Sequence, residues 1–213
     1  MCMVISGSGA ASIVYTDDDY SFTAPATNTS WTFSGVNIGT ASATRLVIVG
    51  VFYVNATPNT ATCTIAGVAG TSAVHTRSTG GTADETEAMI FTASVASGTT
   101  ATITVNTGTA KGCWIGVWSA YDLTSTTPVD TSVAPSSGTT ITLDLDVSPG
   151  GVACGMGITP AASTWTGFTE DYDKISGVWT SGASVASSSG ATPLTVRATT
   201  TSAGATMCAA SFR

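Results

Sequence analysis

The stretch that decides the fold is Leu46-Val-Ile-Val-Gly-Val-Phe-Tyr-Val54. Alternate residues of a β-strand point to opposite faces of its sheet, and here both alternating sets are apolar. The run is about half as long as a membrane-spanning helix needs to be. It therefore predicts a central β-strand that is covered on both faces.

Two further stretches show how other strands are covered. Ile141-Thr-Leu-Asp-Leu-Asp-Val147 alternates apolar and polar residues, which predicts a strand with one buried face and one wet face. Trp114 and Trp118 share one face of a predicted strand, with Gly116 between them. A glycine at that position leaves room for the two indoles to pack across a sheet.

Similar β-rich runs recur along almost the whole chain, separated by clusters of Gly, Ser, Thr, Asn and Pro. The predicted strands are 20–24, 31–36, 45–55, 61–65, 72–76, 87–94, 101–106, 112–122, 139–147, 152–159, 178–181, 194–199 and 205–212. Residues 164–168 and 181–189 are predicted to be loops. Many short strands at this spacing indicate an all-β antiparallel sandwich or barrel.

The predicted organisation is one domain and one terminal extension. Residues 1–19 end in Asp17-Asp-Asp19 and are expected to form a short acidic arm, and residues 20–213 are expected to form a single β-sandwich domain. The last strand, 205–212, carries mostly small residues, so we expect it in the interior of a sheet beside 45–55.

Composition and charge exclude several classes of protein. The chain has 213 residues, of which 43% are hydrophobic and only 9% charged, which argues against a coiled coil and against a disordered chain. The net charge is −7, and the six basic residues are scattered singly. Binding to nucleic acid or to an anionic membrane needs clustered Lys and Arg, so we expect neither partner. The first residues lack the features of a secretory signal, and no secretion is expected.

The cysteines predict no metal site. They are Cys2, Cys63, Cys113, Cys154 and Cys208. Their number is odd, no two form a C-x-x-C pair, and the last four lie in apolar runs. We expect all five to be free thiols of a protein folded in a reducing cytoplasm, the last four of them in the core.

No catalytic signature is present in the sequence. His75 is the only histidine and no G-x-S-x-G motif accompanies it, so we expect a sheet-surface or interface residue. Asp144 and Asp146 share one strand face, as a solvated face would. The acids of 17–19 and 170–173 lack the spacing of a calcium-binding EF-hand loop. We therefore expect no catalytic residue, no cofactor and no metal ligand.

Aromatic residues offer one candidate binding surface. Trp165, Phe168, Tyr172 and Trp179, together with Trp31, could stack on a glycan or contact a protein partner. The alternative for all of them is packing in the core or at an interface.

Several motifs, taken in order, resemble a known family. They are 45–51, the hairpin Thr62-Cys-Thr-Ile-Ala-Gly-Val-Ala-Gly-Thr71, the strand–turn–strand segment 87–105, Ile115-Gly-Val-Trp-Ser-Ala-Tyr-Asp-Leu123 followed by Thr127-Pro-Val-Asp130, and the closing strand 205–212. Over residues 20–213 the chain resembles the jelly-roll-like β-sandwich domain of phage virion structural proteins, which is also found in secreted bacterial surface proteins.

The resemblance implies a non-enzymatic structural protein of a bacteriophage virion, assembled in the host cytoplasm. A capsid decoration, a head fibre or a tail appendage would each fit, with other virion proteins as partners. The resemblance also implies a homo-oligomer, with a trimer as the expected form. An alternative is a carbohydrate-binding adhesin or receptor-binding module that recognises a host surface glycan. A glycan hydrolase is the third class considered. The resemblance transfers no catalytic residue.

Overall fold

The computed structural model describes residues 10–23, 27–55, 60–78, 85–134, 141–159, 164–175, 179–187, 194–200 and 206–213, and these residues form strands without a helix. The strands are β1 (Ser12–Phe22), β2 (Asn28–Asn37), β3 (Leu46–Asn55), β4 (Thr62–Ile65), β5 (Val68–Ala69), β6 (Thr71–Arg77), β7 (Glu85–Ser94), β8 (Thr100–Tyr121), β9 (Asp130–Ala134), β10 (Ile141–Val147), β11 (Val152–Thr159), β12 (Thr164–Thr166), β13 (Thr169–Ile175), β14 (Trp179–Ala186), β15 (Leu194–Thr200) and β16 (Thr206–Phe212).

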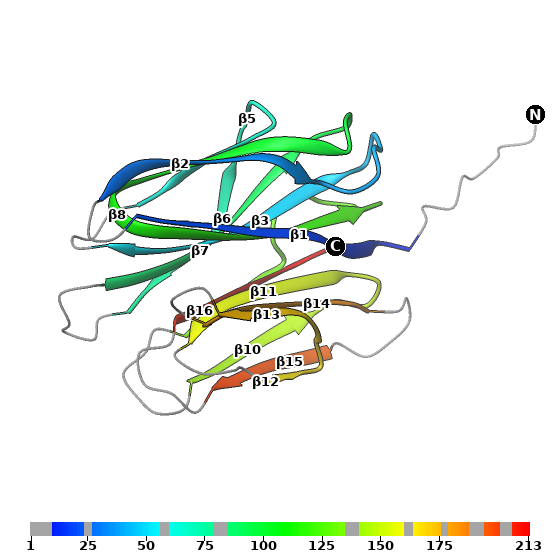
Figure 1. Ribbon diagram of the computed structural model, residues 1–213. Helices are drawn as coiled ribbons and strands as arrows, with labels where there is room; N and C mark the ends of the chain where they lie inside the picture. The colour runs from blue at the N-terminus through cyan, green and yellow to red at the C-terminus, as the bar shows by residue number, and fades with distance from the viewer. Residues whose placement is uncertain are drawn as a thin grey trace, which may run out of the picture.

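Sheet A is organised around β8, a single strand of 22 residues where the sequence predicted two. The sheet runs β5-β4-β8-β3-β7-β6, and β1 and β2 also pair with β8. The first half of β8 lies between β2 and β4, so that Val105 pairs with both Trp31 and Cys63. Its second half lies between β1 and β3. The sheet curls until it is nearly closed (Figure 1).

The central strand β3 is covered on both faces, as predicted. Val49, Val51 and their neighbours on one face pack inside the curl of sheet A. Ile48 and Phe52 point the other way, into a second apolar cluster that sheet B covers. The apolar residues on the two faces of β3 therefore belong to two different hydrophobic cores.

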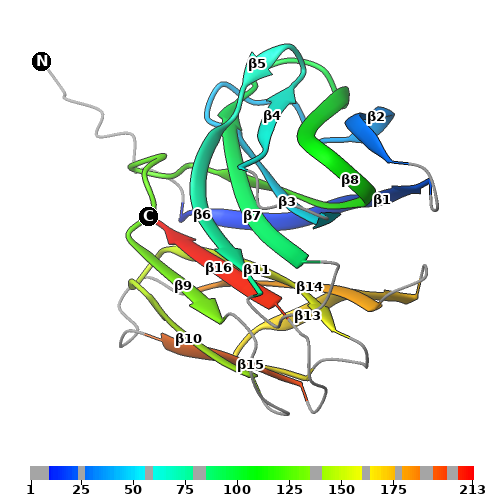
Figure 2. The ribbon, with the colours of Figure 1, turned by 90° about the vertical axis from the view of Figure 1, so that its left-hand side faces the viewer.

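Two further sheets complete a stack. Sheet B runs β13-β14-β11-β16-β9, and sheet C runs β10-β15-β12. A third apolar cluster lies between them. Figures 1 and 2 show sheet A at the top, sheet B in the middle and sheet C at the bottom. The strand pairings among the described residues are antiparallel, so the predicted all-β antiparallel sandwich is confirmed. The described apolar side chains of β10 are buried and the polar ones between them are exposed, also as predicted.

Several segments differ from the prediction, among them β5 and β9, which were not predicted as strands. Residues 12–19 form most of β1 and pair with β8 instead of standing apart as an arm; residues 1–9 lie outside the described residues. β12 and β13 are strands, although 164–168 were expected to be a loop and 170–173 carried no strand prediction. The first part of 181–189 belongs to β14. The local sequence is rich in Asp, Ser, Thr and Gly, and only pairing with a neighbouring strand makes these segments extended.

The position of the last strand is a correction. β16 lies inside a sheet, but its neighbours are β11 and β9 of sheet B, and β3 is not one of them. All seven of its residues are buried. It faces β6 and β7 across the interface between sheets A and B, where Thr86 and Thr206 share a hydrogen bond of 2.8 Å between their hydroxyl oxygens. Its small side chains permit this close approach of two sheets.

Glycines shape the interface between sheets A and B. A Cβ atom at Gly116 of β8 or at Gly182 of β14 would overlap the ring of Tyr172, which lies between them. Gly116 therefore makes room for a tyrosine of the other sheet, whereas the sequence suggested room for Trp114 and Trp118. The ring centroids of Trp118 and Tyr172 are 6.2 Å apart.

A buried arginine ties two loops to sheet A. Arg45 is only 1% exposed, and its guanidinium donates hydrogen bonds to four backbone carbonyls. The acceptors are the oxygens of Val95 at 2.7 Å, Ser97 at 2.8 Å, Gly39 at 2.9 Å and Ile38 at 3.0 Å. A fixed planar fork of donors suits this arrangement better than a lysine would.

Candidate functional site

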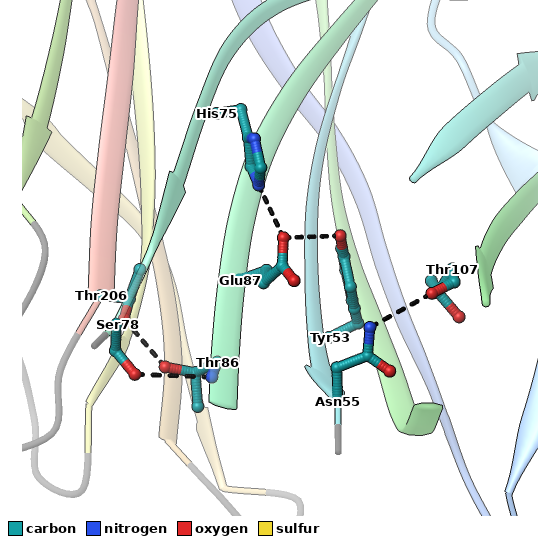
Figure 3. A network of polar contacts seen from close by, with 8 residues as sticks. All are labelled: Tyr53, Asn55, His75, Ser78, Thr86, Glu87, Thr107 and Thr206. Atoms are coloured by element: carbon teal, nitrogen blue, oxygen red, sulfur yellow. Dashed lines mark hydrogen bonds and ion pairs between the residues drawn. The ribbon is translucent and has the colours of Figure 1, made fainter. Parts of the chain in front are cut away.

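The only histidine belongs to a buried polar network across three strands of sheet A (Figure 3). His75 Nε2 of β6 lies 2.6 Å from Glu87 Oε2 of β7, and the hydroxyl of Tyr53 of β3 lies 2.9 Å from the same oxygen. The side chain of Glu87 is 1% exposed and that of His75 is 34% exposed. The hydroxyl of Tyr53 donates to Glu87 Oε2, and a ring nitrogen of His75 shares a hydrogen bond with the same oxygen.

The surroundings of Tyr53 indicate that this hydrogen-bond network has a structural role. Burial of the phenol and the charge of Glu87 raise the pKa of Tyr53 well above its usual value. The hydroxyl therefore stays protonated and remains a donor to the carboxylate. His75 is partly exposed on the edge strand β6, where a sheet-surface histidine was expected. The network bridges β3, β7 and β6 and satisfies a buried carboxylate.

Two grooves flank β1. One groove, of about 480 Å³, lies between β1, the segment 37–42 and the end of β8, where it is lined by Tyr121 and by Asp122 just beyond the strand. A second, of about 270 Å³, lies between β1 and sheet B, lined by 169–171 and 184–186. Val14 and Tyr15 line both grooves, and Val14 is 52% exposed. An exposed apolar side chain therefore separates two hollows on one strand.

The surroundings of these grooves are strongly acidic. β1 carries Asp17, Asp18 and Asp19, and β13 contributes the four charged residues Glu170, Asp171, Asp173 and Lys174. Lys174 Nζ lies 2.5 Å from Asp18 Oδ2, so this one cation links sheet B to β1. Six acids and one lysine on these two strands leave an excess of negative charge near the grooves, and one of the six, Asp171, lines the second groove.

Asp171 stands at the wall of the second groove. Its Oδ2 accepts a hydrogen bond of 2.7 Å from the indole Nε1 of Trp118. Burial raises the pKa of Asp171, and the hydrogen bonds from Trp118 and Ser184 oppose this effect in part. A neutral indole and a hydroxyl stabilise the carboxylate less than a cation would.

The aromatic candidates do not gather on one exposed face. Trp165 and Phe168 pack edge to face, with ring centroids 5.3 Å apart, in the core between sheets B and C. Tyr172 lies in the other core, between sheets A and B. Trp31 is buried inside sheet A and donates to Thr107 Oγ1 at 3.0 Å. Trp179 begins β14, but its side chain lies outside the described residues.

The remaining chemical groups are placed as follows. Cys63, Cys113, Cys154 and Cys208 are free and buried, and Cys2 lies outside the described residues. Burial raises the pKa of Cys63 to about 12. In the part of the chain that the structure describes, no three His, Cys, Asp or Glu residues are grouped to hold a metal ion. The same part contains no helix long and apolar enough to cross a membrane.

Sequence reasoning missed the grooves beside β1. The signal in the sequence is Asp17-Asp-Asp19, which the local pattern places in a terminal arm. The aspartates in fact occupy a paired strand, where Asp17 Oδ1 accepts from the backbone N–H of Asp18 and Asp19 Oδ1 from that of Tyr20. Only the pairing of β1 with β8 brings them beside sheet B.

Comparison with known proteins identifies no family for this chain. No family model matches it, and no curated protein matches it. Among solved structures it is similar to a chain described as an anti-sigma factor domain-containing protein, with 6% sequence identity over 84% of this chain and 77% of that chain. The TM-score is 0.24, which carries no argument about fold or function.

Proposed function

We propose that this chain is a structural protein of a bacteriophage virion that acts through protein–protein contacts on the particle surface. The ordered motifs over residues 20–213 support the virion assignment through their resemblance to virion sandwich domains. Capsid decoration, head fibre and tail appendage are the roles within this proposal, and assembly takes place in the host cytoplasm.

The observation that carries the contact function is the position of the exposed apolar side chains. Val14, Tyr20 and Phe22 are each about half exposed on β1, and Val129 and Val133 are comparably exposed at β9, the edge of sheet B. β1 lies near β14, toward the other edge of that sheet. Exposed apolar residues on sheet edges are typical of protein-binding surfaces.

Two such surfaces on different sides of one sandwich suit a protein that sits between neighbours. Each copy can then contact a further copy on one side and another virion protein on the other. We propose a homo-oligomer, with a trimer as the form that the resemblance favours. Light scattering should show a species larger than the monomer; a monomer both in solution and on the particle would contradict this part of the proposal.

Mass spectrometry of purified particles tests the virion assignment. The particles are those of the phage or prophage whose genome encodes the chain, and we expect its peptides in them after a density gradient. A copy number close to that of the major capsid protein would indicate a decoration protein, and a few copies a fibre or appendage. Absence from particles, while the lysate contains the protein, would refute the proposal.

A further inference from the structure

We propose that β1 and its two flanking grooves form a docking surface for a basic, extended segment of a partner protein. The inference rests on the proposed function in one respect, namely that the chain works by binding other proteins. It names the surface and the chemistry of the partner, which the resemblance does not supply.

Charge is the first argument. β1 and β13 together carry six acids and one lysine, Lys174, which pairs with Asp18 across the two strands. Asp122 lines the first groove and Asp171 the second, so each hollow has a carboxylate in its wall. A partner segment with Lys or Arg side chains would supply the missing positive charge, and complementary charges both guide and orient association.

The surroundings of the Asp171 carboxylate favour a cationic side chain in the second groove. Its carboxylate is partly buried, and its hydrogen bonds come from Trp118 and Ser184, which are neutral. A cation delivered into this groove would stabilise the ionised form that burial now disfavours.

A second, independent feature lies directly behind the groove wall. Tyr172 is buried, and its hydroxyl has no hydrogen-bond partner. It lies against Gly116, which pairs with Asp18 of β1, and its ring stacks on that of Tyr15 with centroids 5.5 Å apart. Tyr15 lines both grooves. The ring of Tyr172 therefore supports the groove wall at Tyr15 from behind, while its hydroxyl oxygen lies against Gly116 in the interface between sheets A and B.

The shape of the surface indicates an extended segment. The grooves, of about 270 and 480 Å³, are at or below the middle of the range for small-molecule pockets and suit single side chains. They lie on the two sides of β1, with the exposed Val14 between them. A chain that crosses β1 can place a basic side chain in each groove and an apolar one against Val14.

The backbone of β1 limits where such a segment can bind. The N–H groups of Asp18 and Tyr20 already donate to the side chains of the preceding aspartates, at 2.9 and 2.7 Å. Strand addition is therefore blocked there, as is common at protected sheet edges. The part of β1 that lines the grooves is the other half, 12–16.

The test is a titration of the full ¹⁵N-labelled chain with a capped peptide that alternates Lys and Val over six residues. A peptide with Glu in place of Lys is the matched control probe. We expect amide shifts of Val14, Asp122 and Ser184 with the lysine peptide, and none with the glutamate peptide. Binding should weaken as the salt concentration rises.

Two variants test the grooves separately. Asp171→Asn keeps an oxygen for the indole of Trp118, and Asp122→Asn suits a backbone with φ of 56°, which asparagine adopts readily. Each variant should weaken binding roughly tenfold. Asp144→Asn, on the exposed face of β10, removes the same charge at a distance and should leave binding unchanged. Unchanged indole N–H resonances of the tryptophans other than Trp118, and a melting temperature no lower than the parent's, would verify that the variants fold.

Three outcomes would overturn the inference. They are no shifts at millimolar peptide, shifts centred away from β1, and an equal loss of affinity in Asp144→Asn, which would mean general attraction to an acidic protein. None of these outcomes bears on whether the chain is present in particles. Absence from particles together with groove-specific binding would refute the virion assignment alone.

Discussion

Replacing Arg45 by methionine should destabilise the protein more than any single surface change. Methionine keeps an unbranched apolar stem but removes the guanidinium. In the folded protein this group satisfies four backbone carbonyls from two loops, and its residue is almost fully buried. The sheet would then retain its packing and lose its hydrogen bonds to both loops.

The size of the effect follows from which acceptors water can reach. The bonds to the carbonyls of Val95 and Ile38 are buried, whereas those to Gly39 and Ser97 are partly exposed and can be hydrated. The carbonyl of Ile38 keeps a donor, because Ser119 Oγ also donates to it at 2.7 Å, so its loss is one ordinary hydrogen bond of about 1 kcal/mol. The carbonyl of Val95 loses its donor, which costs about 2 kcal/mol, and together these give about 3 kcal/mol in the free energy of unfolding. For a domain of this length that corresponds to a fall of about 9 °C in the melting temperature.

Thermal and urea unfolding, followed by circular dichroism, measure this change. Arg213→Met removes an exposed guanidinium at the chain end and serves as the control, with an expected change below about 0.5 kcal/mol. Arg45→Lys should fall between the two, because an ammonium cannot span four acceptors. A loss of less than about 1 kcal/mol in Arg45→Met would refute the reasoning, since it would mean that the loops find water or other donors at little cost.

Four further predictions concern the interface, the last strand, one carboxylate and the thiols. Gly182→Val should lower stability by about 1–3 kcal/mol in urea titrations, because the added side chain overlaps the ring of Tyr172; full stability would contradict the packing described. Deletion of 205–213 removes a central strand of sheet B and should yield insoluble or unfolded protein, so a soluble product with the parent's far-UV spectrum and melting temperature would contradict it. Because burial raises the pKa of Asp171 in the folded state, its ionisation opposes folding; Asp171→Asn should therefore melt above the parent at pH 7, with a difference that shrinks as the pH falls toward that pKa, and a gap that widens on acidification would count against this. Five thiols should react in denatured, unreduced protein, whereas Cys63, with its pKa near 12, should stay unreactive in folded protein at pH 9; fewer than five would reveal a disulfide bond.

The sequence by itself determined the strands whose burial repeats regularly. β3 has apolar side chains on both faces, and both faces are buried. β10 alternates apolar and polar side chains, and only its apolar face is buried. The burial of Cys63 and Cys154 also follows from the apolar runs around them. In each case the pattern of side chains along the strand reports the number of faces that are removed from water, which is a local property.

Two charged strands at or near sheet edges escaped prediction for the same reason. β1 and β13 carry seven charged residues between them and lie at or near sheet edges, where one side of the strand remains wet. Their hydrophobic period is therefore broken, and the sequence resembles that of a loop. The docking surface proposed above is built from these strands, so its existence could not be read from local pattern.

Only the tertiary structure decided which surfaces meet. The small residues of β16 indicated a tight interior but not that β11 and β9 would be its neighbours, and Gly116 indicated free space but not that Tyr172 would fill it. Arg45 finds acceptors up to 52 residues away along the chain, at Ser97. Periodicity encodes how much of a strand is buried, whereas the partner of each buried face is selected by the packing of all sheets together, because many apolar faces of similar size compete for one another.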